Sequence, residues 1–167
     1  GAMLAATGRK MDPADRGAML IRELLGDRRA EVAIIGPESP LGQAVSLMAA
    51  RRIGAIAVVG PKGQVVGILS ERDLLRGLDA SGPALLEQAV SSLMAGEVIT
   101  TSPGARVADA VTMMNFHGVR HLPGLDEGGL VDVISLRDVV ERQLEDLEEE
   151  NDALRSRLAA AGMPEPE

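Results

Sequence analysis

The stretch Val66-Gly-Ile-Leu-Ser-Glu-Arg-Asp73 occurs a second time, in altered form, as Val131-Asp-Val-Ile-Ser-Leu-Arg-Asp138. In both copies an apolar run leads into Ser-x-x-Asp, and two aliphatic residues follow. Ser-x-x-Asp ahead of an apolar run is typical of a helix start, because the serine and the carboxylate can each accept a hydrogen bond from a free backbone N–H group. Each copy therefore predicts a strand that runs directly into a helix.

The same helix start could also bind an anion. The first N–H groups of a helix have no partners inside the helix, and the helix dipole is positive at this end. The carboxylate could then accept hydrogen bonds from two sugar hydroxyls, and Arg72 or Arg137 lies between the serine and the carboxylate. Capping alone explains each copy equally well. The residues of either copy leave both interpretations open.

The composition limits what the chain can do. Its 167 residues are 46% hydrophobic but include one aromatic residue, Phe116, so the core must be aliphatic. Cysteine is absent, and His117 and His121 lie in no metal-binding pattern, so we expect no metal site. The net charge is −8, and no basic run offers a surface for phosphates, which argues against nucleic-acid binding.

The ends of the chain suggest no targeting signal. Gly1-Ala2-Met3 resembles the scar of a removed tag, and we interpret residues 1–18 as a flexible lead-in and residues 162–167 as a tail. The sequence contains neither a charged leader with an apolar run nor an apolar stretch of membrane-spanning length. We therefore expect a cytoplasmic protein that does not enter a membrane.

The chain repeats itself at an offset of 66 residues. Identical or similar residues recur at Val32 and Val98, Pro37 and Pro103, Leu41 and Val107, Ala44 and Ala110, Val45 and Val111, and Met48 and Met114. The offset is 65 at Ser70 and Ser135, so the turns that precede the two motifs differ in length by one residue. Length differences of this kind are tolerated in surface turns.

Each repeat predicts the element order β-α-β-β-α. The predicted elements are a short strand (32–35; 98–101), an amphipathic helix from Leu41 or Val107, a strand (55–59; 121–125), the motif strand and the motif helix. We assign residues 19–80 to the first repeat and 84–143 to the second, with a linker at 79–83. A unit of this size cannot cover its own sheet, so the two repeats should pack on each other in an α+β fold.

The tandem repeat and its strand Gly67-Ile-Leu-Ser-Glu-Arg-Asp-Leu74 resemble a pair of CBS domains, also called a Bateman module. The resemblance covers residues 19–143. It implies two units that form a pseudo-two-fold pair. It also implies that the cleft between them binds an adenosine compound, namely AMP, ADP, ATP, S-adenosylmethionine or NAD(H).

The resemblance also implies roles for individual residues. The motif carboxylate would hold the ribose hydroxyls, the serine would face a phosphate, and the backbone of the preceding strand would contact the adenine. Cations near the second motif would favour that repeat for a phosphate group. The expected binding residues are Gly54, Ala55, Ile56, Ser70, Arg72, Asp73, Thr100, Arg120, His121, Leu122, Pro123, Ser135, Arg137 and Asp138.

The second repeat departs from the family pattern at two positions. Asp132 stands where the first repeat has Gly67, which adds a side chain and a negative charge. Gly124 follows Pro123 where an aliphatic residue is usual, which should weaken that strand. Asp132 favours an alternative function, in which the fold is kept as a scaffold and its nucleotide sites are degenerate.

The second motif helix continues into a C-terminal extension, residues 144–161. Apolar residues and one asparagine alternate at spacings of four and three, at Val140, Leu144, Leu147, Asn151, Leu154, Leu158 and Ala161. This is the seam of a coiled coil with Asn151 at an a position, and Glu150 and Arg155 lie at the g and e positions beside it. The alternatives are a solvated acidic helix and a helix whose seam packs on its own body.

The leading functional hypothesis is a regulatory module that binds an adenosine nucleotide, with AMP favoured. We expect a homodimer that signals to itself or to an unidentified protein partner. We expect no enzyme activity, because the chain has no cysteine, no serine–histidine pairing and no metal-binding pattern. The scaffold is the alternative.

Overall fold

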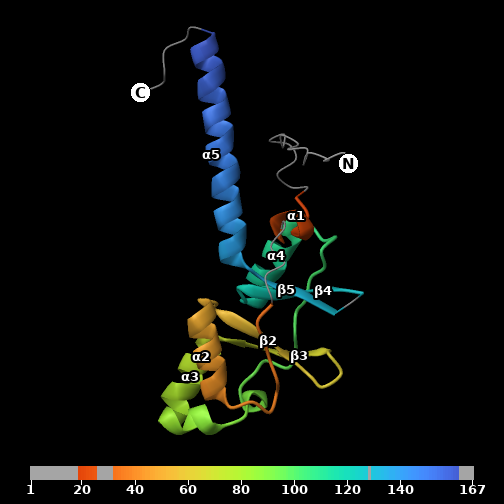
Figure 1. The fold of residues 1–167 in the computed structure, drawn as a ribbon, viewed down its shortest axis with the longest axis vertical. Coiled ribbons are helices and arrows are strands. Elements are labelled where there is room, and N and C mark those ends of the chain that lie inside the picture. The colour runs from red at the N-terminus through yellow and green to blue at the C-terminus, as the bar shows by residue number, and fades with distance from the viewer. Residues whose placement is uncertain (1–18, 26–31, 128, 162–167) are drawn as a thin grey trace, which may run out of the picture.

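The computed structural model describes residues 19–25, 32–127 and 129–161, so the expected lead-in and tail lie outside the described residues. The helices and strands, in chain order, are α1 (Ile21–Leu25), β1 (Ile34–Ile35), α2 (Leu41–Arg51), β2 (Ala55–Val59), β3 (Val65–Ser70), α3 (Glu71–Ser81), the 3-10 helices η2 (Gly82–Glu87) and η3 (Val90–Ser92), α4 (Val107–His117), β4 (His121–Asp126), β5 (Gly129–Ser135) and α5 (Leu136–Ala160) (Figure 1). The α+β fold class is confirmed.

The two repeats build similar sheets. In the first repeat β1 is parallel to β2 and β2 is antiparallel to β3, and in the second β4 is antiparallel to β5. The strand predicted at 98–101 is reduced to one parallel bridge between Thr101 and Gly124. This bridge lies 66 residues after the pair formed by Ile35 and Val58. The backbone pairing therefore preserves the repeat seen in the sequence.

Each repeat has its own hydrophobic core. Helix α2 buries Leu41, Ala44 and Met48, and α4 buries their counterparts at the same spacing, as the amphipathic pattern predicts. Side chains from β2, β3 and α3 complete the first core, and side chains from β4, β5 and α5 complete the second. The cores are aliphatic, as the composition requires.

Helix α1 packs in the second core although residues 21–25 lie at the start of the segment assigned to the first repeat. Ile21 is fully buried there, and its N–H group donates to the carbonyl of Ala105 over 2.9 Å. The first repeat is closed in the same way by Val90, which comes after α3 in the chain. Figure 1 shows α1 beside α4, away from the first repeat. Residues 19–25 and 88–94 therefore fill equivalent places in opposite repeats.

Two local features bear on the sequence-based expectations, and the first differs from them. The predicted linker at 79–83 is helical, because α3 continues to Ser81 and η2 starts at Gly82. Strand β4 extends through Gly124 to Asp126, and its register with β5 shifts between Gly124 and Leu125. A Cβ atom at Gly124 would lie 2.8 Å from Cδ1 of Ile134, so the Ile134 side chain occupies the space that a larger residue would need.

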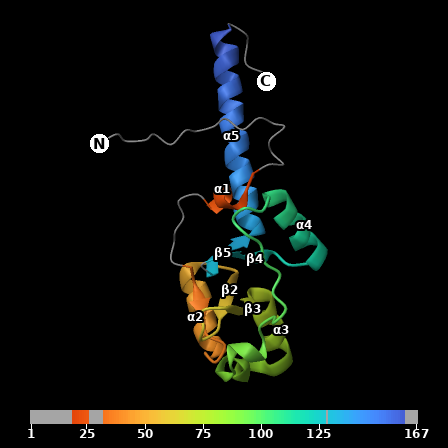
Figure 2. The same ribbon diagram turned by 90° about the vertical axis from the view of Figure 1, so that its right-hand side faces the viewer.

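The C-terminal extension forms one helix with the second motif. Helix α5 has 25 residues, starts next to β5 and projects away from both repeats (Figures 1 and 2). Contacts with α1, α4 and β5 hold its first turns. No helix in the described ranges combines the length and apolar character needed to cross a membrane.

Candidate functional site

Both Ser-x-x-Asp motifs form closed capping boxes. In the first, the N–H and hydroxyl groups of Ser70 donate to Oδ2 of Asp73 over 2.9 and 2.5 Å, and the N–H of Asp73 donates to the Ser70 hydroxyl over 3.3 Å. The second motif repeats these three bonds between Ser135 and Asp138 at 2.8, 2.5 and 3.1 Å. The capping interpretation is therefore confirmed for both helices.

Capping leaves room for a second role of the carboxylate. The hydrogen bonds of Ser70 use Oδ2 of Asp73, and Oδ1 accepts none from the part of the chain that the structure describes. Asp73 is only partly buried, so a ligand hydroxyl can approach it. A carboxylate can accept from several donors at once. The first motif can thus cap its helix and contact a ligand.

The sheets place equivalent residues beside each motif serine. Ala55 is the cross-strand partner of Ser70, and His121 is the partner of Ser135. The residue before each partner also contacts the motif helix: Gly54 O accepts from Glu71 N over 3.0 Å, and Arg120 O accepts from Leu136 N over 2.9 Å. The expected adenine-contacting strand ends are therefore adjacent to the motif helices in both repeats.

The two repeats meet where these residues lie. A Cβ atom at Gly54 would be 3.2 Å from both Cε1 and Nε2 of His121 and 3.5 Å from Oε2 of Glu71. Nearby, Nη1 of Arg72 donates to the carbonyl of Gly118 over 3.4 Å. Figure 2 shows β5 directly beyond the end of the first sheet, and β2 and β5 are in contact. Residues of the two repeats thus form one shared surface.

His121 is the titratable group at the centre of this surface. Its burial is the main cause that lowers its pKa below the usual value of 6.5, and the positive charge of Arg120 acts in the same direction. The carboxylates of Asp138 and Glu71 partly oppose this shift. The surroundings of His121 at the junction of the repeats therefore favour the neutral imidazole over the charged one.

The other expected residues divide into buried and exposed positions. Ile56, Leu122 and Pro123 have fully buried side chains, and Ala55 is nearly so, which leaves only their backbone for a ligand. Arg120 and Arg137 are exposed, and Nε of Arg137 donates to Oε1 of Glu141 over 2.6 Å. Thr100 is partly buried beside the Thr101 bridge.

Glu71 and Gly118 also belong to this surface, although neither was expected from the sequence. Glu71 is the first residue of α3, at the position that Leu136 occupies in the second repeat, and its carboxylate faces His121 across the junction. Comparing these aligned positions would have shown a charge in only one repeat. Gly118 contributes a backbone carbonyl, and such a group cannot be identified from a pattern of residues.

Asp132 has a structural role. Its Oδ1 accepts from the N–H of Val133 over 2.7 Å. In the first repeat the equivalent N–H group, that of Ile68, donates to the carbonyl of Ala95 over 3.1 Å. Alternation along β5 places Asp132 on the sheet face opposite to Ser135. Its carboxylate therefore satisfies an edge amide on the face away from the motif serine.

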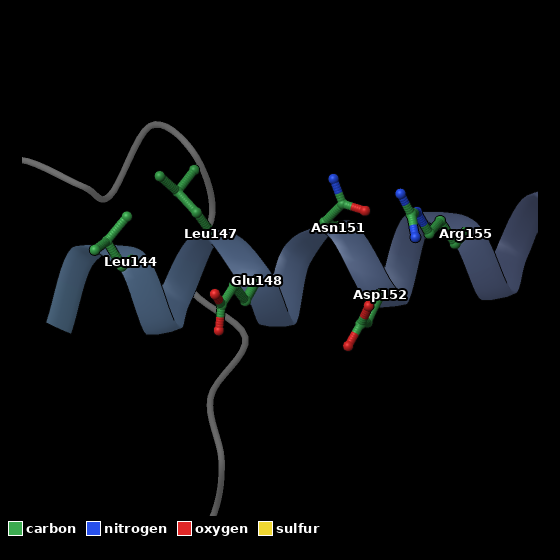
Figure 3. Close-up of a pocket in the computed structure, with 6 residues that line it drawn as sticks. All are labelled: Leu144, Leu147, Glu148, Asn151, Asp152 and Arg155. Carbon is green, nitrogen blue, oxygen red and sulfur yellow. The ribbon is translucent and has the colours of Figure 1, made fainter. Parts of the chain in front are cut away.

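The described residues contain no group of three or more histidine, aspartate or glutamate side chains that could hold a metal ion. The structure does have a surface hollow of about 420 Å³, but this hollow lies along α5 beyond the second motif, between Leu144 and Arg155 (Figure 3).

Comparison with known protein families matches the CBS domain at residues 21–80 and 90–145, the two halves that carry the capping boxes. The chain belongs to the CBS-domain family. Its two CBS domains correspond to the two repeats, and the resemblance deduced from the motifs is confirmed.

Individual relatives agree with this assignment. The CBS domain-containing protein YhcV of Bacillus subtilis is 32% identical over 119 residues, which cover 68% of this chain and 80% of that protein. A CBS-domain protein of Agrobacterium tumefaciens has 32% identity and a TM-score of 0.69, with coverage of 74% of this chain and 98% of the other. A CBS domain protein of Pyrobaculum aerophilum, at 22% identity, has a TM-score of 0.64 over 72% of this chain and 89% of its own, which shows a shared fold.

Proposed function

We propose that this chain is a regulatory module that binds an adenosine nucleotide at the junction of its two CBS domains. Tandem CBS domains are regulatory modules. The observation that carries the proposal is the contact of His121 with Gly54 and Glu71, because it brings the strand ends and motif helices of both domains to one surface. AMP is the favoured ligand. ADP, ATP, S-adenosylmethionine and NAD(H) are the other candidates.

The solved structure from Pyrobaculum aerophilum is a complex with AMP. At 22% identity it supports the fold of this chain, and AMP is the ligand of that protein. It makes AMP the first nucleotide to test here. In our proposal Asp73 or Asp138 binds the ribose hydroxyls, while Ser70 or Ser135 and the neighbouring arginines bind the phosphate.

The two halves of the junction are not equivalent. On one side the His121 ring lies over Gly54 with Glu71 beside it. At the corresponding positions on the other side stand Ala55, Arg120 and Leu136, because the repeat relates them by 65 or 66 residues. Ala55 is smaller than His121, and this side has the cation Arg120 in place of Gly54 and the uncharged Leu136 in place of the acid Glu71. We therefore propose that one nucleotide binds per chain, on the Arg120 side.

Calorimetric titration of AMP into Asp73→Asn and Asp138→Asn tests the proposal. Loss of a carboxylate that accepts ribose hydroxyls should weaken AMP binding by about ten- to a hundredfold, or about 1.5–3 kcal/mol. The 2′,3′-dideoxy analogue of AMP should bind as weakly to the parent protein. Asp79→Asn, an exposed carboxylate on the same helix α3, is the matched control and should bind AMP like the parent.

The alternative is a structural scaffold, and the closed capping boxes favour it. If the two motifs only cap helices, each Asp→Asn substitution should lower the free energy of unfolding by about 1 kcal/mol and leave nucleotide affinity unchanged. Thermal unfolding of the same variants measures this. A parent protein that binds no adenosine compound, or variants that bind AMP as the parent does, would exclude the sensor.

We further propose that the module has no catalytic activity, neither binds nucleic acid nor enters a membrane, and acts in the cytoplasm as a homodimer with an unidentified protein partner. Leu75 on α3 and Phe116 on α4 support a contact between chains, because their side chains are 69% and 84% exposed. A contact between chains that buried these two side chains would remove apolar surface from water.

A further inference from the structure

Helix α5 carries an apolar stripe that nothing in the described part of the chain covers. Val140, Leu144, Leu147 and Leu154 are 48%, 55%, 47% and 50% exposed. The helix moves away from both CBS domains after its first turns, so neither domain can cover the later residues (Figure 1). An apolar stripe of this length on a helix normally faces a partner.

The stripe has the geometry of a coiled-coil seam. Leu144, Leu147 and Asn151 project from the same side of α5, whereas Glu148 and Asp152 point the other way (Figure 3). These residues line the hollow of about 420 Å³ along the helix, together with Arg155. Alternating spacings of four and three keep the stripe on one side of a supercoiled helix. The partner is therefore expected to be another helix.

We propose that two copies of this chain associate through α5 as a parallel, in-register coiled coil. This pairing adds a second contact to the proposed homodimer, beside the one at α3 and α4, and is independent of nucleotide binding. Leu144, Asn151 and Leu158 occupy the a positions, and Val140, Leu147 and Leu154 occupy the d positions, which extends the seam over about 27 Å at 1.5 Å per residue.

Asn151 determines the direction of the two helices. In a parallel dimer without stagger, Asn151 faces Asn151 of the second copy, and the two amides can form hydrogen bonds with each other. In an antiparallel dimer each asparagine faces a leucine and its amide is desolvated without a partner, which is unfavourable. A single asparagine at an a position therefore selects the parallel, in-register pair.

The charges beside the seam are compatible with this arrangement. In a parallel dimer a g residue faces the e residue five positions later in the second helix. The two pairs that flank the seam are Gln143 with Glu148 and Glu150 with Arg155. Neither pair joins two acids, and the second joins opposite charges. The acidic character of α5 therefore does not oppose pairing of two copies.

The folded body offsets the shortness of the seam. Three heptads form a marginal coiled coil when the helix must also form from an unfolded peptide. Here the capping box at Ser135 starts α5, and its first turns pack on α1, α4 and β5. Because the helix exists before association, two copies need to lose less conformational entropy on pairing.

Light scattering of the full chain and two matched variants tests the seam. Leu154→Asp places a charge in the seam, and Ser156→Asp places the same charge on the opposite, exposed side of the same turn. The parent and Ser156→Asp should have twice the mass of one chain, and the dissociation constant of Leu154→Asp should rise at least tenfold.

The direction is tested by cross-linking, since the chain has no cysteine of its own. Leu158→Cys lies near the end of the seam, so mild oxidation should join two chains only if their helices are parallel and in register. Failure of Leu158→Cys to cross-link, or a monomeric parent at tens of micromolar, would overturn the proposal.

A chain without residues 1–18 that dimerises only after truncation would show that this segment, and not a second copy, covers the seam. AMP titration of Leu154→Asp should match the parent, which separates this test from that of the nucleotide site.

Discussion

The two CBS domains have the same backbone arrangement, but different residues form the hydrogen bonds at the edges of their sheets. The edge of β3 is paired by Ala95, from a later segment of the same chain, whereas the amide at the same place in β5 is satisfied by the side chain of Asp132. This difference arises because the chain takes a different course after each motif helix. After α3 the chain returns through η2 and η3 to the first sheet, but α5 continues outward, and no segment after it returns to β5 as far as residue 161.

The different courses of the chain explain why α1 is needed to complete the core of the second domain. In the first domain Val90, on the returning segment, closes the core. In the second domain nothing returns within the described residues, and Ile21 closes the equivalent core from the other end of the repeat region. The two domains are therefore folded as a pair, since the second takes part of its core from α1, which the family match places at the start of the first.

The largest effect is expected for Ile21→Ala. Removing a fully buried isoleucine side chain should lower the free energy of unfolding by about 2–5 kcal/mol. Ile34→Ala, at a side chain that is 49% exposed, is the matched control and should lose much less. Urea denaturation monitored by circular dichroism measures both. Equal losses in the two variants would mean that α1 does not belong to the second core.

The second prediction exchanges Gly67 of β3 and Asp132 of β5, which are equivalent residues in the two domains. At Gly67 a Cβ atom would lie 2.4 Å from Sδ of Met94 and 3.1 Å from the carbonyl oxygen of Ala95. Gly67→Asp should therefore be destabilised by about 1–3 kcal/mol through overpacking, in addition to the burial of its charge. Asp132→Gly loses one hydrogen bond to Val133 and should lose about 1 kcal/mol.

Thermal unfolding of both variants tests this difference. If Gly67→Asp is tolerated as well as Asp132→Gly, the segment that contains Met94 and Ala95 does not hold the edge of β3 in solution. If Asp132→Gly also changes AMP affinity, then Asp132 belongs to the ligand site rather than to the strand edge.

The fold could be predicted from the sequence because the repeated residues are those that determine where helices and strands form. Apolar spacing placed α2 and α4, and Ser-x-x-Asp placed the starts of α3 and α5. The sequence could not predict that α1 enters the second core, since a short apolar segment carries no information about which sheet it covers. The contact of His121 with Gly54 was also not predictable, because it depends on how the two domains are oriented.

A smaller effect is expected from pH, because His121 is only partly buried. Its pKa is lowered in the folded protein, mainly by burial. Below about pH 6.5 the unfolded chain therefore binds a proton that the folded chain does not, and stability should fall as the pH drops from this value. Arg120, Asp138 and Glu71 are the charged groups that act on this histidine.

Thermal unfolding between about pH 7.5 and pH 5.5 measures this dependence. His121→Ala, which copies Ala55 of the first domain, should reduce the loss of stability on acidification, whereas His117→Ala on the exposed end of α4 controls for the loss of a histidine. An unchanged acid slope in His121→Ala would show that this side chain is not buried at the junction in solution.

The smallest effect concerns the ends of α2 and α4. Gly118 ends α4 with φ 66°, and Arg52 adopts the same left-handed conformation at the end of α2, with φ 55°. This conformation destabilises a residue that has a Cβ atom by about 1–2 kcal/mol. Glycine adopts it without this strain, but it makes the unfolded chain more flexible, which lowers stability by about 0.4–1 kcal/mol. Arg52→Gly should therefore raise the free energy of unfolding by up to about 1 kcal/mol. Ala50→Gly, inside α2, is the control and should lower the free energy of unfolding by about as much. Urea midpoints that shift in the same direction for both variants would contradict the left-handed cap at Arg52.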